Sequence, residues 1–122
     1  VFEVDDPRPD VANGVTRVRS RDGLELHLPY EAVVEAHFPL LVRISGDEVM
    51  LFTEAPRGIS ARNVFRGTIG RHELNAGTVE LRIDTPAPIH VRLTEEADAA
   101  LGLAPGREVW VAIRTRAIQV IG

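Results

Sequence analysis

Hydrophobic and polar residues alternate along several short stretches of this chain, which is the pattern of half-buried β-strands. Leu24–Leu28 alternates strictly, and Val15–Arg19 alternates in part. Asp22-Gly23 lies between these two stretches. Asp-Gly is a strong signal for a tight hairpin, because both central residues of such a turn tolerate positive φ angles. The first half of the chain is therefore expected to contain a β-hairpin.

Further strands are expected at short intervals through the rest of the chain. The alternation in Thr78–Asp84 places its three aliphatic residues on one face. Pro86 and Pro88 end that strand, because proline has no N–H to donate to a central ladder. The other predicted strands are Leu40–Ser45, Glu48–Phe52, Val64–Ile69, Ile89–Leu93, Val109–Ile113 and Ala117–Ile121.

One short helix is expected between the predicted strands Ile89–Leu93 and Val109–Ile113. Thr94 is suited to cap its N-terminus, acidic residues fill its first turn, and Gly102 is a natural stop. Many short strands with one short helix are typical of a small barrel or sandwich. The predicted fold class is therefore all-β. The strand spacing also allows two such units, although no clear internal sequence repeat is visible.

The segment 1–13 has a different composition from the strands that follow it. It is acidic and carries Pro7 and Pro9, so it is interpreted as a linker with one short strand at Phe2–Val4. Val1 stands at the start of the chain, and the single methionine is Met50. We therefore expect a domain taken from a longer protein.

Composition narrows the range of functions. A chain of 122 residues with 44% hydrophobic residues supports one ordinary domain, or two very small ones that share a core. The formal net charge of -4 does not favour nucleic acid or an anionic membrane as a partner. The absence of cysteine excludes disulfides and thiolate metal sites. All 14 basic residues are arginines, whose planar forks suit two-pronged contacts with oxyanions.

The usual catalytic motifs are missing from the sequence. The four histidines are scattered without metal-ligand spacing, and there is no glycine-rich phosphate loop and no nucleophile elbow. We therefore expect no catalytic residue, no metal site and no enzymatic activity in this chain.

Three short segments are instead rich in hydrogen-bond donors. They are Ser60-Ala61-Arg62-Asn63, Leu93-Thr94 and Arg114-Thr115-Arg116. A tetrahedral oxyanion needs only donors around it, and hydroxyl, N–H and guanidinium groups supply them. The same residues also have structural roles open to them: a turn at Ser60, a helix cap at Thr94, and surface ion pairs for the arginines. The spacing alone leaves both interpretations open.

The run 59–121 resembles the TOBE/Mop family of molybdate-binding domains. The resemblance rests on Ser60-Ala61-Arg62-Asn63-Val64-Phe65-Arg66-Gly67-Thr68-Ile69, on Ala100-Leu101-Gly102-Leu103 with Pro105-Gly106, and on the closing run Val111–Ile121. Val42–Leu51 is similar, more loosely, to the segment that precedes this domain in ATP-binding subunits of molybdate or tungstate importers. The expected organisation is thus a linker at 1–13, a β-rich subdomain at 14–57 packed on the next domain, and an oxyanion-binding domain at 58–122.

The resemblance implies small OB-like barrels that dimerise and bind molybdate or tungstate at subunit interfaces, with no further cofactor. Matched to the family pattern, the oxyanion-binding residues are Ser60, Arg62, Thr94, Arg114 and Thr115. Arg114 stands where the family usually has lysine, a change that keeps the charge but enlarges and flattens the donor.

The expected function is that of a C-terminal regulatory domain of an ABC importer's ATP-binding subunit. The partners implied are a second copy of the chain, a nucleotide-binding domain and a membrane permease, at the cytoplasmic face of the plasma membrane and without direct contact to nucleic acid. Two alternatives remain: a structural dimerisation module with an empty site, and the effector domain of a molybdate-responsive transcription factor. A carbohydrate-binding OB module would need an aromatic platform, for which an aromatic content of 5% gives little support.

Overall fold

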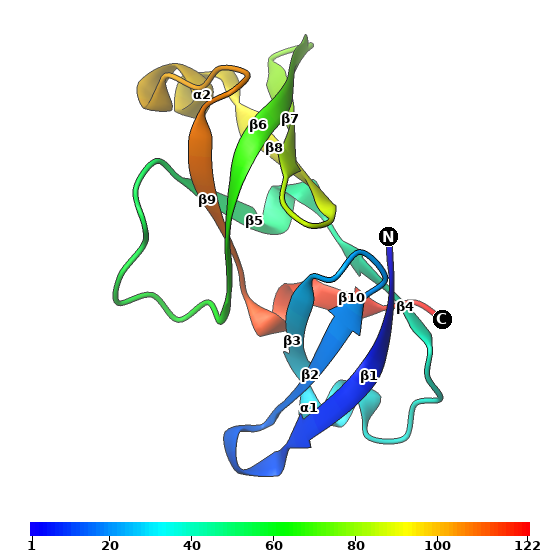
Figure 1. Cartoon of the computed structure of the whole chain (residues 1–122). Coiled ribbons are helices and arrows are strands. Elements are labelled where there is room, and N and C mark those ends of the chain that lie inside the picture. Colours follow the sequence, from blue (N-terminus) through cyan, green and yellow to red (C-terminus); the bar gives the residue numbers. More distant parts are fainter.

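The computed structural model describes all residues from Val1 to Gly122, and it consists of two antiparallel β-sheets set end to end (Figure 1). The strands are β1 (Phe2–Asp10), β2 (Val15–Ser20), β3 (Glu25–Pro29), β4 (Leu40–Ile44), β5 (Val49–Phe52), β6 (Asn63–Asn75), β7 (Thr78–Asp84), β8 (Pro88–Thr94), β9 (Glu108–Ile113) and β10 (Ile118–Val120). The helices are α1 (Tyr30–Val33) and α2 (Glu95–Leu101), with 3-10 turns η1 (Val11–Asn13), η2 (Gly46–Glu48) and η3 (Thr115–Ala117). The all-β prediction is confirmed.

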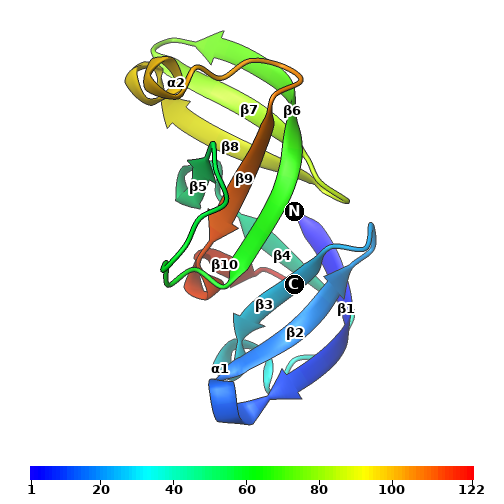
Figure 2. The ribbon, with the colours of Figure 1, turned by 60° about the vertical axis from the view of Figure 1, so that its left-hand side comes forward.

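The two halves of the chain have the same topology. Each runs through three strands, a short α-helix, a fourth strand, a 3-10 turn and a fifth strand. The first sheet has the order β10-β4-β1-β2-β3, and the second has the equivalent order β5-β9-β6-β7-β8. Each half therefore gives its last strand to the sheet of the other half. Figure 2 shows β4 and η2 running from the first sheet to β5, and β9 and η3 running back to β10.

This exchange changes the expected organisation of the chain. Residues 53–62 join the two topological halves, because β5 ends at Phe52 and β6 begins at Asn63. However, β5 lies in the second sheet and β10 in the first, so neither half is complete without a strand from the other. The two halves form one intertwined unit.

The expected linker at 1–13 is wrong for most of its length, because β1 covers Phe2–Asp10 and lies between β4 and β2. The register shifts between Asp5 and Arg8, and Asp6 has a positive φ of 58°. A bulge of this kind accommodates Pro7, which cannot donate to the ladder. The sequence did not predict this strand because its residues after Val4 are mostly exposed and show no alternation, and because proline normally interrupts a sheet.

One hydrophobic core joins the two sheets. A single cluster of 21 buried residues draws on both halves, with Val18 and Leu26 from the first sheet and Leu81 and Val111 from the second. The predicted hairpin is confirmed, since β2 and β3 pair in antiparallel register and Gly23 in the turn has a φ of 92°. The aliphatic residues of the alternating strands thus face this core, and their polar neighbours face solvent.

The predicted helix is α2, and its ends are those expected. The Thr94 hydroxyl accepts a hydrogen bond from the Ala97 N–H, and Gly102 closes the helix with a left-handed φ of 62°. The single-turn helix α1 was not predicted, because four residues are too few to show a helical period. Neither α-helix has the length and apolar character needed to cross a membrane.

Candidate anion-binding cleft

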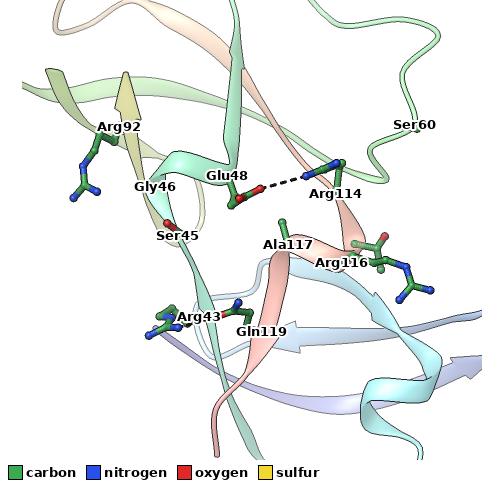
Figure 3. Close-up of a pocket in the computed structure, with 11 residues that line it drawn as sticks. Arg43, Ser45, Gly46, Glu48, Ser60, Arg92, Arg114, Arg116, Ala117 and Gln119 are labelled. Atoms are coloured by element: carbon green, nitrogen blue, oxygen red, sulfur yellow. Dashed lines mark hydrogen bonds and ion pairs between the residues drawn. The ribbon is translucent and has the colours of Figure 1, made fainter. Parts of the chain in front are cut away.

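A cleft of about 910 Å³ opens where the two segments that cross between the sheets lie next to each other (Figure 3). Turns η2 and η3 form its centre, and the loop before β6 contributes one side. Only one of the lining residues, Ala117, is hydrophobic. The lining consists of Arg43, Ser45, Gly46, Glu48, Ser60, Arg92, Arg114, Thr115, Arg116, Ala117 and Gln119.

The two 3-10 turns at the centre are built in the same way. Each follows an extended residue, Ser45 with a ψ of 135° or Arg114 with a ψ of 143°. Each ends at a β-branched residue, Val49 or Ile118, whose N–H bonds back to the first carbonyl of the turn. The two crossings therefore present side chains at equivalent positions to one cleft.

Close packing of η2 on β8 brings the second sheet to the cleft. A Cβ at Gly46 would lie 2.8 Å from His90 Nδ1 and 3.2 Å from the backbone N of Arg92. A side chain at this position would therefore push the turn away from the strand. Glycine allows the contact, and Arg92 consequently lines the cleft.

Positive charge is concentrated in the cleft, although the chain as a whole has a net charge of -4. Four of its lining residues are arginines, and Glu48 is the only carboxylate among them. Arg114 Nη2 lies 3.3 Å from Glu48 Oε2, and Figure 3 shows these two side chains directed toward each other. Arg43 Nη2 donates a 2.8 Å hydrogen bond to the neutral Gln119 Oε1.

The other two arginines of the cleft are held by carboxylates outside its lining. Arg92 contacts Asp47 at 3.2 Å and Glu80 at 3.1 Å. The hydrogen bond from Arg92 lowers the pKa of Glu80, and the same bond raises the pKa of Arg92. Arg116 lies 2.9 Å from Glu31, whose pKa is lowered by a hydrogen bond with its own backbone and by the one with Arg116. All four guanidinium groups remain charged, as arginine does throughout the physiological range.

The structure brings three of the five predicted site residues together. Ser60, Arg114 and Thr115 all line the cleft. Ser60 comes from the loop before β6, whereas Arg114 and Thr115 come from the crossing between β9 and β10. These segments are about 50 residues apart in the sequence, so the family pattern identified a grouping that local periodicity could not.

The other two predicted residues lie outside this cleft. Arg62 donates hydrogen bonds to the backbone carbonyls of Ile59 at 2.8 Å and Ser60 at 3.1 Å. It lines a separate hollow with Asp10, Asn13, Val15, Arg17 and His27. Thr94 caps α2. Thr94 therefore takes the structural role that the spacing had left open, whereas Arg62 bonds to backbone carbonyls and does not form the surface ion pair considered for the arginines.

Sequence reasoning missed two arginines of the cleft, Arg43 in the first half and Arg92 in the second. Arg43 and Arg92 lie on exposed faces of β4 and β8, and nothing in their local sequence separates them from other surface arginines. A signal was nevertheless present. The same short pattern precedes both crossings, as Val42-Arg43-Ile44 in β4 and as Val111-Ala112-Ile113 in β9. This similarity reflects the shared topology of the two halves.

No group of three or more metal-ligating side chains is present in the structure. Fold and cleft together define a class: a small β-domain made of two interlocked OB-like barrels, with a cationic cleft between them. Residues 59–118 match the family model of the TOBE domain. The chain belongs to the TOBE domain family through this second half.

Similar proteins cover more of the chain than the family model does. The chain is 38% identical over 97 residues to a molybdenum import ATP-binding protein ModC of Rhizobium etli, covering 78% of this chain. It is 37% identical over 110 residues to a ModC protein of Mesorhizobium japonicum, covering 88% of this chain. The aligned parts are only 27% and 29% of those two proteins, so the chain corresponds to a little over a quarter of their length.

A solved structure matches the whole fold. The cytoplasmic molybdate-binding protein ModG, in a crystal form with molybdate bound, superposes with a TM-score of 0.76. The match covers 98% of this chain and 91% of that one at 21% identity. The likeness therefore covers the fold of both halves of the chain.

Proposed function

We propose that this chain is a regulatory oxyanion-binding domain that holds molybdate or tungstate in the cleft between η2 and η3. The observation that carries the proposal is the gathering of four arginines around one open cleft in a chain of net charge -4. Two similar proteins support the same choice of anion: ModG is a molybdate-binding protein crystallised with molybdate, and the ModC proteins are named for molybdenum import.

The donors in the cleft suit a tetrahedral dianion. Such an anion only accepts hydrogen bonds, so its site needs charged and neutral donors from several directions. Arg114 offers a planar fork, and Ser60 and Thr115 offer hydroxyl groups beside it. Arg43 adds a cation whose side chain is hydrogen-bonded to the neutral Gln119. In this proposal Arg62 acts indirectly, by holding the carbonyl groups of the loop that carries Ser60.

We place the domain at the C-terminal end of an importer's ATP-binding subunit, because the relatives that it matches are named as such subunits. A nucleotide-binding domain in the same parent chain and a membrane permease would then be its partners, at the cytoplasmic face of the plasma membrane. In that setting this part of the protein binds its ligand and leaves ATP hydrolysis to the rest of the parent chain.

We also propose a homodimer, for which the second sheet provides an apolar face. Met50, Ala112 and Val64 stand opposite one another across β5, β9 and β6. Met50 and Val64 are each 39% exposed, and Ala112 between them is fully buried. The equivalent positions of the first sheet include Arg43 and Gln119 instead. Only one of the two equivalent faces is therefore apolar, and an exposed apolar face of this kind is typical of an interaction surface.

Titration calorimetry tests the binding proposal. Tungstate and molybdate are expected to give saturable binding, whereas chloride at equal ionic strength is expected to give none. A binding ligand would also raise the melting temperature, since a hundredfold excess over its dissociation constant adds about 2.7 kcal/mol to the free energy of unfolding. Absence of both signals at millimolar tungstate would contradict the proposal.

A structural dimerisation module with an empty site is the second candidate. The ion pair between Arg114 and Glu48 favours it, because it occupies a guanidinium that the anion would need. Light scattering separates the two candidates when it is combined with the titration. A dimer that forms without any tungstate binding would support the module, and a monomer at high protein concentration would contradict both dimer proposals.

A further inference from the structure

We infer that Glu48 sets the affinity and the charge selectivity of the cleft, by occupying Arg114 when no anion is bound and by repelling dianions more than monoanions. This inference rests on the proposed function, because it concerns the same cleft. Nothing in the family pattern that identified Ser60 and Arg114 points to Glu48.

The position of Glu48 makes it a direct competitor of a bound anion. Its Oε2 atom lies 3.3 Å from Arg114 Nη2, and both residues line the cleft. The Glu48 and Arg114 side chains are 48% and 63% exposed. An ion pair as open to water as this contributes little to stability and exchanges partners readily. An oxyanion can therefore take the place of the carboxylate at the guanidinium without disrupting the fold.

The carboxylate is not required by the architecture at this position. Glu48 is the third residue of η2, and Ala117 is the third residue of the equivalent turn η3. Both residues line the cleft. A methyl group therefore meets the structural needs of the turn in the second half. The carboxylate of the first half is an additional feature, directed at Arg114.

The other acidic residues near the cleft differ from Glu48 in their placement. Glu31, Asp47 and Glu80 bind arginines of the cleft but do not line it. They pair with Arg116 and Arg92 at distances of 2.9 to 3.2 Å. Glu48 alone places a negative charge inside the space that an anion would occupy, so its charge acts on that anion directly.

The size of the effect follows from Coulomb's law. In water, one negative charge about 5 Å from a dianion lowers its affinity roughly tenfold. For a monoanion of the same shape the repulsion is halved, so the loss is about threefold. The four arginines of the cleft favour a dianion over a monoanion. Glu48 consequently reduces the ratio of the two affinities.

Two substitutions at Glu48 and two anions test this inference. Glu48→Gln keeps the shape of the side chain without its charge, and Glu48→Ala introduces the residue that η3 carries. Glu108→Gln is the matched control, because Glu108 forms an exposed pair with Arg66 at 2.7 Å outside the cleft. Tungstate and perrhenate are tetrahedral oxyanions that carry two charges and one charge respectively. Thermal unfolding of each variant establishes that it is folded before its titration.

The expected result is an increase in tungstate affinity of about tenfold for both Glu48 variants, with an increase of about threefold for perrhenate. Glu108→Gln is expected to leave the affinities for tungstate and perrhenate unchanged. Unchanged or weaker tungstate binding in folded Glu48→Gln would overturn the inference and leave the proposed function standing. Equal gains for the two anions would overturn the charge selectivity, because neither the release of Arg114 nor the removal of a steric obstacle separates a dianion from a monoanion by repulsion. If neither the wild type nor Glu48→Gln binds tungstate, the proposed function itself fails, and the inference fails with it.

Discussion

At the scale of single residues, Arg114 carries the largest share of the proposed binding. It lines the cleft, and its only carboxylate partner is Glu48 at 3.3 Å. We predict that Arg114→Ala weakens tungstate binding about tenfold to a hundredfold, because a hydrogen bond to a charged group contributes about 1.5–3 kcal/mol. Calorimetric titration at one salt concentration measures the change.

Arg66→Ala is the control for Arg114→Ala. Arg66 pairs with Glu108 and stacks 5.9 Å from the centre of the Trp110 ring, away from the cleft. Its removal takes the same charge from the molecule and should change tungstate affinity little. Equal losses for the two variants would mean that the anion responds only to diffuse charge, and the specific site would be ruled out.

Arg62 is predicted to matter less than Arg114. Its guanidinium is bonded to the carbonyl groups of Ile59 and Ser60, so its loss would loosen the loop that carries the Ser60 hydroxyl. We expect Arg62→Ala to weaken tungstate binding by no more than about threefold, which corresponds to less than about 1 kcal/mol. A loss as large as that of Arg114→Ala, in the same titration, would show that Arg62 contacts the anion, as the family resemblance implies.

The sequence predicted part of the site and could not predict the rest, for a physical reason. Ser60, Arg114 and Thr115 belong to a recognisable motif whose residues converge in the cleft. Arg43 and Arg92 enter it only because the two halves exchange their last strands and because η2 packs closely on β8. Local hydrophobic periodicity reports which face of a strand is buried, but not which strand will pair with it.

At the scale of the elements, the Asn63 side chain links the start of β6 to the first sheet by hydrogen bonds. Its side chain is 2% exposed, accepts a hydrogen bond from the His27 N–H at 2.6 Å, and donates to the carbonyls of His27 at 3.1 Å and Ile113 at 3.2 Å. We predict that Asn63→Ala lowers the free energy of unfolding by about 2–4 kcal/mol, because it leaves buried backbone groups without partners.

Denaturant unfolding measures this loss against Asn13→Ala. Asn13 makes one exposed side-chain hydrogen bond, to Asp10, so its removal should cost less than about 0.5 kcal/mol. Similar values for the two variants would contradict the role of Asn63 as a link between the sheets.

The elements themselves were largely predictable. Strict alternation located β3 and β7, and capping residues located α2, because these signals arise from each segment alone. The strand β1 was missed beyond Val4 because its outer residues are exposed and because a bulge accommodates Pro7. Such a bulge depends on the neighbouring strands, and the local sequence gives no measure of it.

At the scale of the whole molecule, the exchange of strands predicts a single cooperative unfolding transition. Neither sheet is complete without a strand from the other half, and one core of 21 buried residues spans both. Trp110 fluorescence reports on the second sheet, and far-ultraviolet circular dichroism reports on all strands. The two signals are expected to change with the same midpoint. Separate midpoints would show that the halves unfold independently and that the exchanged strands do not couple them.

The position of a bound tungsten atom tests the central claim most directly. Tungsten scatters X-rays anomalously, so a crystal of this domain grown with tungstate would locate the ion without reference to any assumed site. We predict a tungsten peak in the cleft, with tungstate oxygens within hydrogen-bonding distance of the Arg114 guanidinium and the Ser60 hydroxyl. A tungsten peak elsewhere on the molecule, with the cleft unoccupied and Glu48 still paired to Arg114, would contradict the account.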